Sequence, residues 1–345
     1  MAKVVLGIGT SHSPVLSTPP ELMPAYAARD RGNKQLLKPP HGTLLSYDDL
    51  LAQAGPETVE EGSRPDFQGQ YERYQKAIAG LAESVAQADP DVLVIFGDDQ
   101  EELYFDDNMP AISIYWGETI PWLPRRSVGA ASPSAWGYGD TEMDYPVDSE
   151  LARYLIEALM DADFDVGQSR YLNDEYGGHV GPAGYIADTW TTEKRRHGLV
   201  HAYGFVLRRI LNGKLIPIVP ITQNTCYPPN QISSRRSYAL GRALRRAIES
   251  WTGDKRVAVA GSGGLSHFVV DEELDRLALN VMRDRNAEAI AALPRERMMS
   301  ATSEINNWIA AAGALEHLQM DLLDYVPARR TPAGTGGGWA FARWS

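Results

Sequence analysis

Residues able to bind metals or move protons follow three short apolar runs of the sequence. His12 follows the run 4–8, the polar series Asp98-Asp99-Gln100 follows the run 92–96, and His267 follows the run 257–260 after a glycine-rich stretch. Imidazole nitrogens and carboxylate oxygens bind divalent metals, and histidine also exchanges protons near neutral pH. If the three runs are neighbouring strands, these side chains meet at one edge of a sheet, where open α/β sheets bind ligands. The pattern therefore predicts a metal or catalytic site.

Each of these residues also has a purely structural interpretation. A histidine after a strand commonly serves as a hydrogen-bonded structural residue, and Asp98 and Asp99 can cap the following turn. The stretch Gly261-Ser262-Gly263-Gly264 has the glycine content of a phosphate cradle, but it lacks the GxGxxG spacing and the Walker lysine. We favour the metal or catalytic site over these alternatives.

Two further groups of residues can extend this site. His197 and His201 are four residues apart, a spacing that binds zinc on a helix, but the HExxH glutamate is absent and Gly198 interrupts the pattern. We therefore expect His201 alone to point toward the site. Glu273 falls in the first turn of a predicted helix that starts near Asp271, where it either complements the helix N-terminus or acts as a ligand.

The elements that position these residues follow from apolar runs and helical periodicity. Strands are predicted at 4–8, 92–96, 111–115, 215–221 and 257–260, and helices at 71–88, 149–162, 235–251 and 272–285. This alternation predicts an α/β fold whose central mixed sheet is flanked by helices on both faces. We expect a single large domain over 1–345, with long loop insertions near 17–75 and 120–195 that contain His41 and His179.

Composition restricts the classes of function. Hydrophobic residues make up 43% and charged residues 23% of the 345 residues, which excludes a disordered chain, a coiled coil or a collagen-like fibre. A formal net charge of −12 argues against nucleic-acid binding, which normally needs a basic surface. The single cysteine, Cys226, excludes an intrachain disulfide and a multi-cysteine metal site.

The same composition favours a cytoplasmic protein. One cysteine fits a reducing compartment, no window approaches the roughly 18 apolar residues of a membrane helix, and the N-terminal run is too short for a signal peptide. We expect no membrane partner. The long insertions and the 8 tryptophans lead us to expect a homo-oligomer.

In their order along the chain, these residues resemble those of the class III extradiol ring-cleaving dioxygenases, most closely the catalytic subunit of protocatechuate 4,5-dioxygenase and its single-chain relatives. The resemblance spans nearly the whole chain, and Gly-Gly-Leu-Ser-His followed by a glutamate is its most specific part. It rests on Ser11-His12, Asp98-Asp99-Gln100, His201, Tyr227-Pro228-Pro229-Asn230, Gly263 to His267 with Glu273, and the segments 303–309 and 332–336.

The resemblance implies an α/β sheet flanked by helices and an enzyme that uses Fe(II) and O₂ to cleave a small catechol-type aromatic ring next to its two hydroxyls. Members of the family hold iron with two histidines and one glutamate. Carried over by position, the first histidine is His12 and the glutamate is Glu273. The second histidine position falls on Gln100, or on Asp99 or Asp98 if the loop shifts, and we take Gln100 as the third ligand.

The resemblance also implies roles around the metal. It assigns the acid–base role to His267 and a contact with bound substrate or oxygen to His201, with Tyr227 and Asp99 as further substrate-binding residues. The absent histidine keeps two other functions open: a metal-dependent hydrolase or lyase that needs no O₂, and a non-catalytic binding protein on the same fold.

Overall fold

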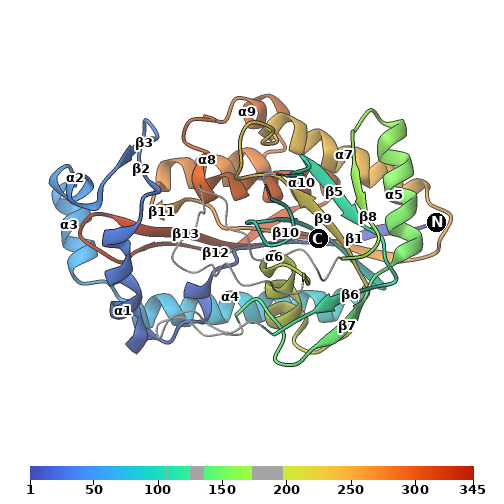
Figure 1. The fold of residues 1–345 in the computed structure, drawn as a ribbon, viewed down its shortest axis with the longest axis horizontal. Helices are drawn as coiled ribbons and strands as arrows, with labels where there is room; N and C mark the ends of the chain where they lie inside the picture. The colour runs from blue at the N-terminus through green and yellow to red at the C-terminus, as the bar shows by residue number, and fades with distance from the viewer. Residues whose placement is uncertain (106, 125–135, 173–196) are drawn as a thin grey trace.

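A mixed sheet forms the centre of the molecule. The computed structural model describes residues 1–105, 107–124, 136–172 and 197–345. Within them, nine strands pair in the order β11-β13-β1-β10-β4-β9-β5-β8, with β12 added to β13 (Figure 1). Their bounds are β1 (Lys3–Thr10), β4 (Val92–Asp98), β5 (Ile112–Tyr115), β8 (Gly167–Ser169), β9 (Ile218–Gln223), β10 (Arg256–Ser262), β11 (His267–Val269), β12 (Met320–Arg329) and β13 (Thr335–Trp344).

The middle of the sheet is parallel and its flanks are antiparallel. β1, β10, β4 and β9 run parallel, whereas β13 is antiparallel to β1 and β5 is antiparallel to β9. The run 92–96 is buried on both sides: Val92, Val94 and Phe96 belong to one hydrophobic core, and Leu93 and Ile95 belong to the other. A continuous apolar run is typical of such a doubly covered parallel strand. The predicted α/β fold with helices on both faces is confirmed.

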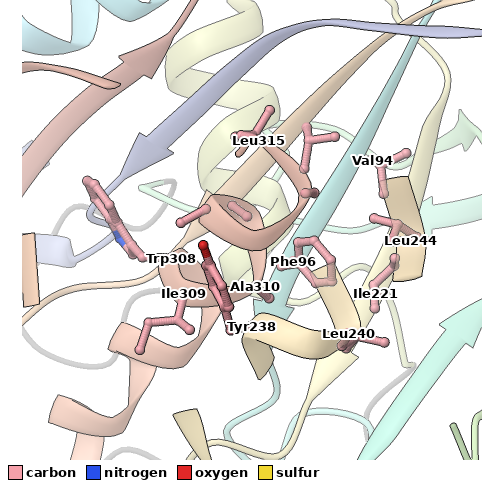
Figure 2. Close-up of a cluster of buried hydrophobic side chains, with 14 of the residues drawn as sticks. Val94, Phe96, Ile221, Tyr238, Leu240, Leu244, Trp308, Ile309, Ala310 and Leu315 are labelled. Atoms are coloured by element: carbon pink, nitrogen blue, oxygen red, sulfur yellow. The ribbon is translucent and has the colours of Figure 1, made fainter. Parts of the chain in front are cut away.

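One face of the sheet is covered by a layer of helices that includes two long, closely packed ones (Figure 1). Their bounds are α5 (Ser149–Asp161), α7 (Ser234–Ser250), α8 (Glu272–Arg283), α9 (Ala287–Ala291) and α10 (Ile305–Ala314). Figure 2 shows Ile309 of α10 beside Tyr238 of α7, and Leu240 of α7 near the strand residues Phe96 and Ile221. The predicted helices at 149–162, 235–251 and 272–285 are confirmed, whereas α10 was not predicted as a helix.

The opposite face carries α4 (Phe67–Ala88), α6 (His201–Phe205), a π-helical segment (Val206–Leu211) and the hairpin of β6 (Thr119–Trp122) with β7 (Met143–Pro146). Asp66 begins α4 by accepting the backbone N–H of Gly69, and Asp89 ends it in the left-handed conformation. Among the described residues, no helix is both long and apolar enough to cross a bilayer.

The first predicted insertion, near 17–75, contains regular structure. It holds α1 (Met23–Ala28), the hairpin of β2 (Leu36–Lys38) and β3 (Thr43–Leu45), α2 (Tyr47–Ala52) and α3 (Pro56–Ser63). A buried ion pair fixes this segment to the C-terminal hairpin, which β12 and β13 form. The Arg330 guanidinium donates to both oxygens of Asp30 at 2.7 and 2.9 Å. The second insertion and His179 lie partly or wholly outside the described residues.

The C-terminal hairpin was not predicted, although it is central to the sheet. β12 and β13 are ten residues long each and pair with one another, and β13 lies between β1 and β11. β13 also fixes the loop before His12, because Ser11 donates its backbone N–H to the Ala340 oxygen and its hydroxyl accepts the Ala340 N–H.

Candidate metal centre

Three neighbouring strand ends and one helix start converge on one edge of the sheet. β1, β10 and β4 are adjacent and parallel, so their carboxyl ends share this edge. His12 lies two residues beyond β1, Asp98 ends β4, and His201 begins α6. One ligand atom from each of these three buried residues lies within 4.8 Å of the others, an arrangement that could hold a metal ion.

His12 presents its Nε2 atom to this cluster. Its Nδ1 lies 3.0 Å from Ser262 Oγ, and the Ser262 hydroxyl donates its own hydrogen to the carbonyl oxygen of Ala202 at 2.6 Å. Ser262 must therefore accept from His12, which places the ring hydrogen on Nδ1 and a lone pair on Nε2. Burial, followed by the neighbouring His201 and His267, lowers the pKa of His12 well below its usual value. The ring is therefore neutral, the form that binds metals.

His201 also presents Nε2, for a different reason. Its Nδ1 is hydrogen-bonded to the Glu102 carboxylate, which only accepts hydrogen bonds when ionised. Its backbone N–H, which has no acceptor within the helix because it lies in the first turn of α6, lies 3.4 Å from the Oε2 atom of the same carboxylate. The Trp136 ring lies against the two imidazoles, with centroids 5.2 Å from His201 and 6.5 Å from His12.

The two Nε2 atoms of His12 and His201 are 3.1 Å apart. With both ring hydrogens on Nδ1, two lone pairs face each other at this distance, which is repulsive unless a cation lies between them. Two nitrogens bound at about 2.1 Å to one ion, in neighbouring coordination positions, are separated by roughly 3 to 3.5 Å. The spacing of the two imidazoles therefore fits a shared metal ion.

Two buried carboxylates complete the donor set. Asp98 Oδ1 lies 3.9 Å and Glu304 Oε2 lies 3.4 Å from His12 Nε2. Asp98 Oδ1 accepts from Asn307, whereas Oδ2 has no hydrogen-bond partner among the described residues. Burial raises the pKa of Asp98 to about 6, and burial together with Asp98 raises the pKa of Glu304 well above its usual value. Two buried carboxylates ionise together only beside a cation, so the donor set fits a divalent metal.

Glu304 is fixed by the glycine-rich stretch and by Gln100. The backbone N–H of Gly264 donates to Glu304 Oε2 at 2.7 Å, and Gln100 Nε2 donates to Oε1 at 2.8 Å. A Cβ atom at Gly263 would lie 2.9 Å from the Glu304 Cβ, so a side chain there would displace the carboxylate. The glycines of this motif serve close packing around the site.

His267 faces Glu304 from the start of β11. Its Nδ1 donates to the Leu265 carbonyl oxygen at 2.9 Å, which leaves a lone pair on Nε2, 3.7 Å from Glu304 Oε2. A Cβ at Gly264 would lie 2.0 Å from the His267 ring, so only glycine leaves room for the imidazole. Burial lowers the pKa of His267 to about 4. The ring is therefore neutral at physiological pH and can accept a proton.

The structure does not bring every predicted site residue into this cluster. The Glu273 side chain is 78% exposed on α8 and forms an ion pair with Arg297 at 3.6 Å. A carboxylate this exposed is stabilised by water and does not need a metal ion to balance its charge. Glu304, not Glu273, lies beside His12. Gln100 is close to the cluster, but its amide nitrogen is directed at Glu304.

Asp99 and Tyr227, the other two expected substrate contacts, lie in the turns after β4 and β9. The buried Asp99 carboxylate accepts the backbone N–H groups of Leu103 and Tyr104 at 2.9 and 3.0 Å, which is the turn-capping alternative considered from the sequence. Burial raises the pKa of Asp99 to about 7. Tyr227 lies in the turn after β9, where its backbone N–H donates to Asn224.

Sequence reasoning missed Glu304 and Glu102. Glu304 belongs to the segment 303–309, which supported the family resemblance, but no role was given to it. The sequence offered one signal for Glu304, which is its position directly before the apolar helix α10. A charged residue buried there needs a partner of opposite charge or a metal ion. Glu102 is the last residue of the acidic series after β4, and nothing in the sequence links it to His201.

The fold and the site thus define an α/β protein with a buried cluster of histidines and carboxylates that could hold a divalent metal. Residues 50–331 match the family model described as the catalytic LigB subunit of aromatic ring-opening dioxygenase, and the chain belongs to this family.

Similar curated proteins carry the name 2,3-dihydroxyphenylpropionate/2,3-dihydroxicinnamic acid 1,2-dioxygenase. One from Cupriavidus necator is 27% identical over 69% of this chain and 63% of its own length. One from Cupriavidus pinatubonensis is 29% identical over 59% of this chain and 51% of its own length. One from Mycolicibacterium gilvum is 27% identical over 86% of this chain and 80% of its own length. The chain therefore spans about half to two thirds of the first two relatives.

Among solved structures, the crystal structure of an uncharacterized protein from Escherichia coli K12 aligns with 79% of this chain and 92% of its own, with a TM-score of 0.45 and 12% sequence identity.

Proposed function

We propose that this protein is an extradiol dioxygenase that opens a catechol-type aromatic ring with O₂ at an Fe(II) centre. The observation that carries the proposal is the pair of buried imidazoles whose Nε2 atoms face each other at 3.1 Å beside two buried carboxylates. The metal would be held by His12, His201, Asp98 and Glu304. Membership of the ring-opening dioxygenase family supports the reaction class.

This ligand set replaces the one expected from the sequence. His201 supplies the second imidazole that the segment after β4 lacks, so it serves as a ligand instead of a substrate contact. Glu304 replaces Glu273, and Gln100 orients Glu304 through its amide group. Ferrous iron bound here supplies O₂ activation and a Lewis acid for the two catechol oxygens.

His267 provides the acid–base function. Its Nε2 lone pair faces the cluster, and its lowered pKa of about 4 keeps it neutral at the pH of the cell. It can therefore take the proton of a substrate hydroxyl, and the resulting imidazolium can return that proton to a developing oxyanion. The hydrogen bond from Nδ1 to Leu265 fixes the ring in the orientation that this transfer needs.

The substrate class follows from the relatives. Their names specify catechols with a propionate or a cinnamic acid side chain. We therefore propose a 2,3-dihydroxyphenyl compound with an acidic side chain as the first substrate to test.

Anaerobic loading with Fe(II), followed by O₂ uptake and ring-fission absorbance with a panel of catechols, tests the function. Glu304→Gln is compared with its matched control Glu273→Gln. We expect Glu304→Gln to lose bound iron and activity, and Glu273→Gln to keep both.

Two outcomes would contradict the proposal. Iron-loaded, folded protein that consumes no O₂ with any catechol would remove the dioxygenase, and turnover without O₂ would favour the hydrolase or lyase alternative. Retention of iron by His201→Asn, with loss of substrate binding alone, would return His201 to the role of a substrate contact.

A further inference from the structure

We propose that Glu102 is a positioning residue that makes His201 a metal ligand. The inference rests on the proposed metal centre and extends it to a residue that does not contact the metal. Glu102 lies four residues beyond Asp98 in the turn after β4, so one short segment supplies both a carboxylate of the cluster and the partner of His201.

The two oxygens of Glu102 have distinct partners. Oε1 is hydrogen-bonded to His201 Nδ1, and Oε2 accepts the Tyr138 hydroxyl at 3.0 Å. The His201 backbone N–H lies 3.4 and 3.5 Å from Oε2 and Oε1. The carboxylate therefore contacts both the ring and the backbone of His201, which fixes the ring orientation relative to the helix start.

The backbone around Glu102 is fixed as well. Asp99 accepts the N–H groups of the three residues from Glu102 onward, and its two oxygens lie 2.9 Å from the Leu103 nitrogen and 3.0 Å from the Tyr104 nitrogen. On the other side, a Cβ at Gly204 would lie 1.9 Å from the Gly137 carbonyl oxygen. α6 therefore packs directly on the backbone beside Tyr138, and this contact brings the tyrosine to Glu102.

The chemistry of the Glu102 carboxylate determines which ring nitrogen of His201 carries the hydrogen. A carboxylate in its ionised form accepts hydrogen bonds and cannot donate them, so in that form Glu102 requires a hydrogen on His201 Nδ1 and directs the lone pair of Nε2 toward His12 Nε2, 3.1 Å away. A neutral amide can donate as well as accept, so it permits the opposite tautomer, which cannot bind the metal through Nε2. Carboxylate partners of ligating histidines commonly change metal affinity by 10–100-fold in this way.

The alternative is that Glu102 only complements the N-terminus of α6. Glu102→Gln distinguishes the two roles, because glutamine can still accept the His201 backbone N–H but no longer determines the ring tautomer. Glu316→Gln is the matched control: Glu316 accepts the Tyr238 hydroxyl at 2.7 Å and pairs with Arg242, on the other side of the sheet from α6.

The test measures Co(II) affinity by absorbance under chelator competition, together with the ¹⁵N shifts of the His201 ring in the metal-free protein. We expect Glu102→Gln to weaken Co(II) binding by about 10–100-fold and to populate the Nε2–H tautomer, with thermal unfolding close to wild type. Glu316→Gln should leave both readouts unchanged.

Unchanged Co(II) affinity and an unchanged Nδ1–H tautomer in Glu102→Gln would overturn the proposal. Weaker Co(II) binding with an unchanged tautomer and a large loss of thermal stability would also overturn it, in favour of a structural role. If wild-type protein binds no divalent metal, the proposed function fails, and the ring ¹⁵N shifts of the metal-free variants still decide whether Glu102 fixes the tautomer.

Discussion

Replacing Asp275 by asparagine should remove a pH-dependent loss of folding stability that arises from the buried Asp275 carboxyl beneath the loop before His267. Asp275 is fully buried on α8 and accepts the backbone N–H and the hydroxyl of Ser266 and the hydroxyl of Tyr325, each at 2.7 Å. Burial raises its pKa to about 7. Asparagine keeps an acceptor for the Ser266 N–H, and its NH₂ group can donate to the two hydroxyl oxygens, so the substitution fits the site.

The magnitude follows from proton linkage. The native carboxyl stays protonated up to about pH 7, whereas the unfolded one ionises near its ordinary pKa of about 3.9. The native state therefore binds more protons between these values, and stability falls as pH rises through this window. Each pH unit within this window lowers the free energy of unfolding by about 1.4 kcal/mol. Wild type should therefore lose about 2 to 3 kcal/mol between pH 5 and pH 8. Because the asparagine does not titrate, the free energy of unfolding of Asp275→Asn should rise by that amount relative to wild type between pH 5 and pH 8.

Urea unfolding of the metal-free protein at pH 5, 6, 7 and 8 measures this difference. Asp254→Asn is the control, since that side chain is 99% exposed and its curve should parallel wild type. If the gap between Asp275→Asn and wild type were the same at pH 5 and pH 8, the native carboxyl would already be ionised at pH 5, as it is in the unfolded chain, and the reasoning from burial would be refuted.

Three further predictions concern packing, a buried charge and the metal. Gly241→Ala places a Cβ 1.9 Å from the Ala310 carbonyl oxygen, so it should destabilise the α7–α10 contact by about 1 to 3 kcal/mol in urea unfolding, whereas Gly32→Ala, with nothing within 4 Å, should not. Asp30→Ala leaves the buried Arg330 unpaired and should cost about 3 to 5 kcal/mol in the same assay; an unchanged midpoint would contradict this. Divalent metal at 100 times its Kd should raise the unfolding free energy of wild type by about 2.7 kcal/mol and leave His12→Ala unaffected.

The parallel core of the sheet could be predicted because its strands are short continuous apolar runs. The runs 4–8, 92–96 and 257–260 fall within β1, β4 and β10, and the predicted convergence of their ends brings His12 beside Asp98. The run 215–221 begins three residues too early, since β9 starts at Ile218. The cytoplasmic location and the homo-oligomer remain predictions from the sequence.

The C-terminal hairpin and part of the site could not be predicted, because their residues depend on tertiary contacts. The glycines 336–338 of β13 weaken any strand pattern, yet they lie in the strand that pairs with both β11 and β12. Glu273 and Glu304 are both carboxylates at a helix start, and only the packing of α10 onto the sheet distinguishes the buried one from the exposed one. His201 was expected in the site, but its role depends on Glu102, 99 residues earlier in the sequence.

The bonds between Ser11 and Ala340 have a consequence for biosynthesis. They join residues 329 positions apart, and β13 pairs with β1 next to His12 and with β11 at His267. While a ribosome is still making the chain, β1 therefore has an open edge that β13 will later cover, and such edges recruit other strands. The loop that carries His12 can reach its final geometry only after residue 340 has left the exit tunnel, so this edge of the sheet is completed late in synthesis.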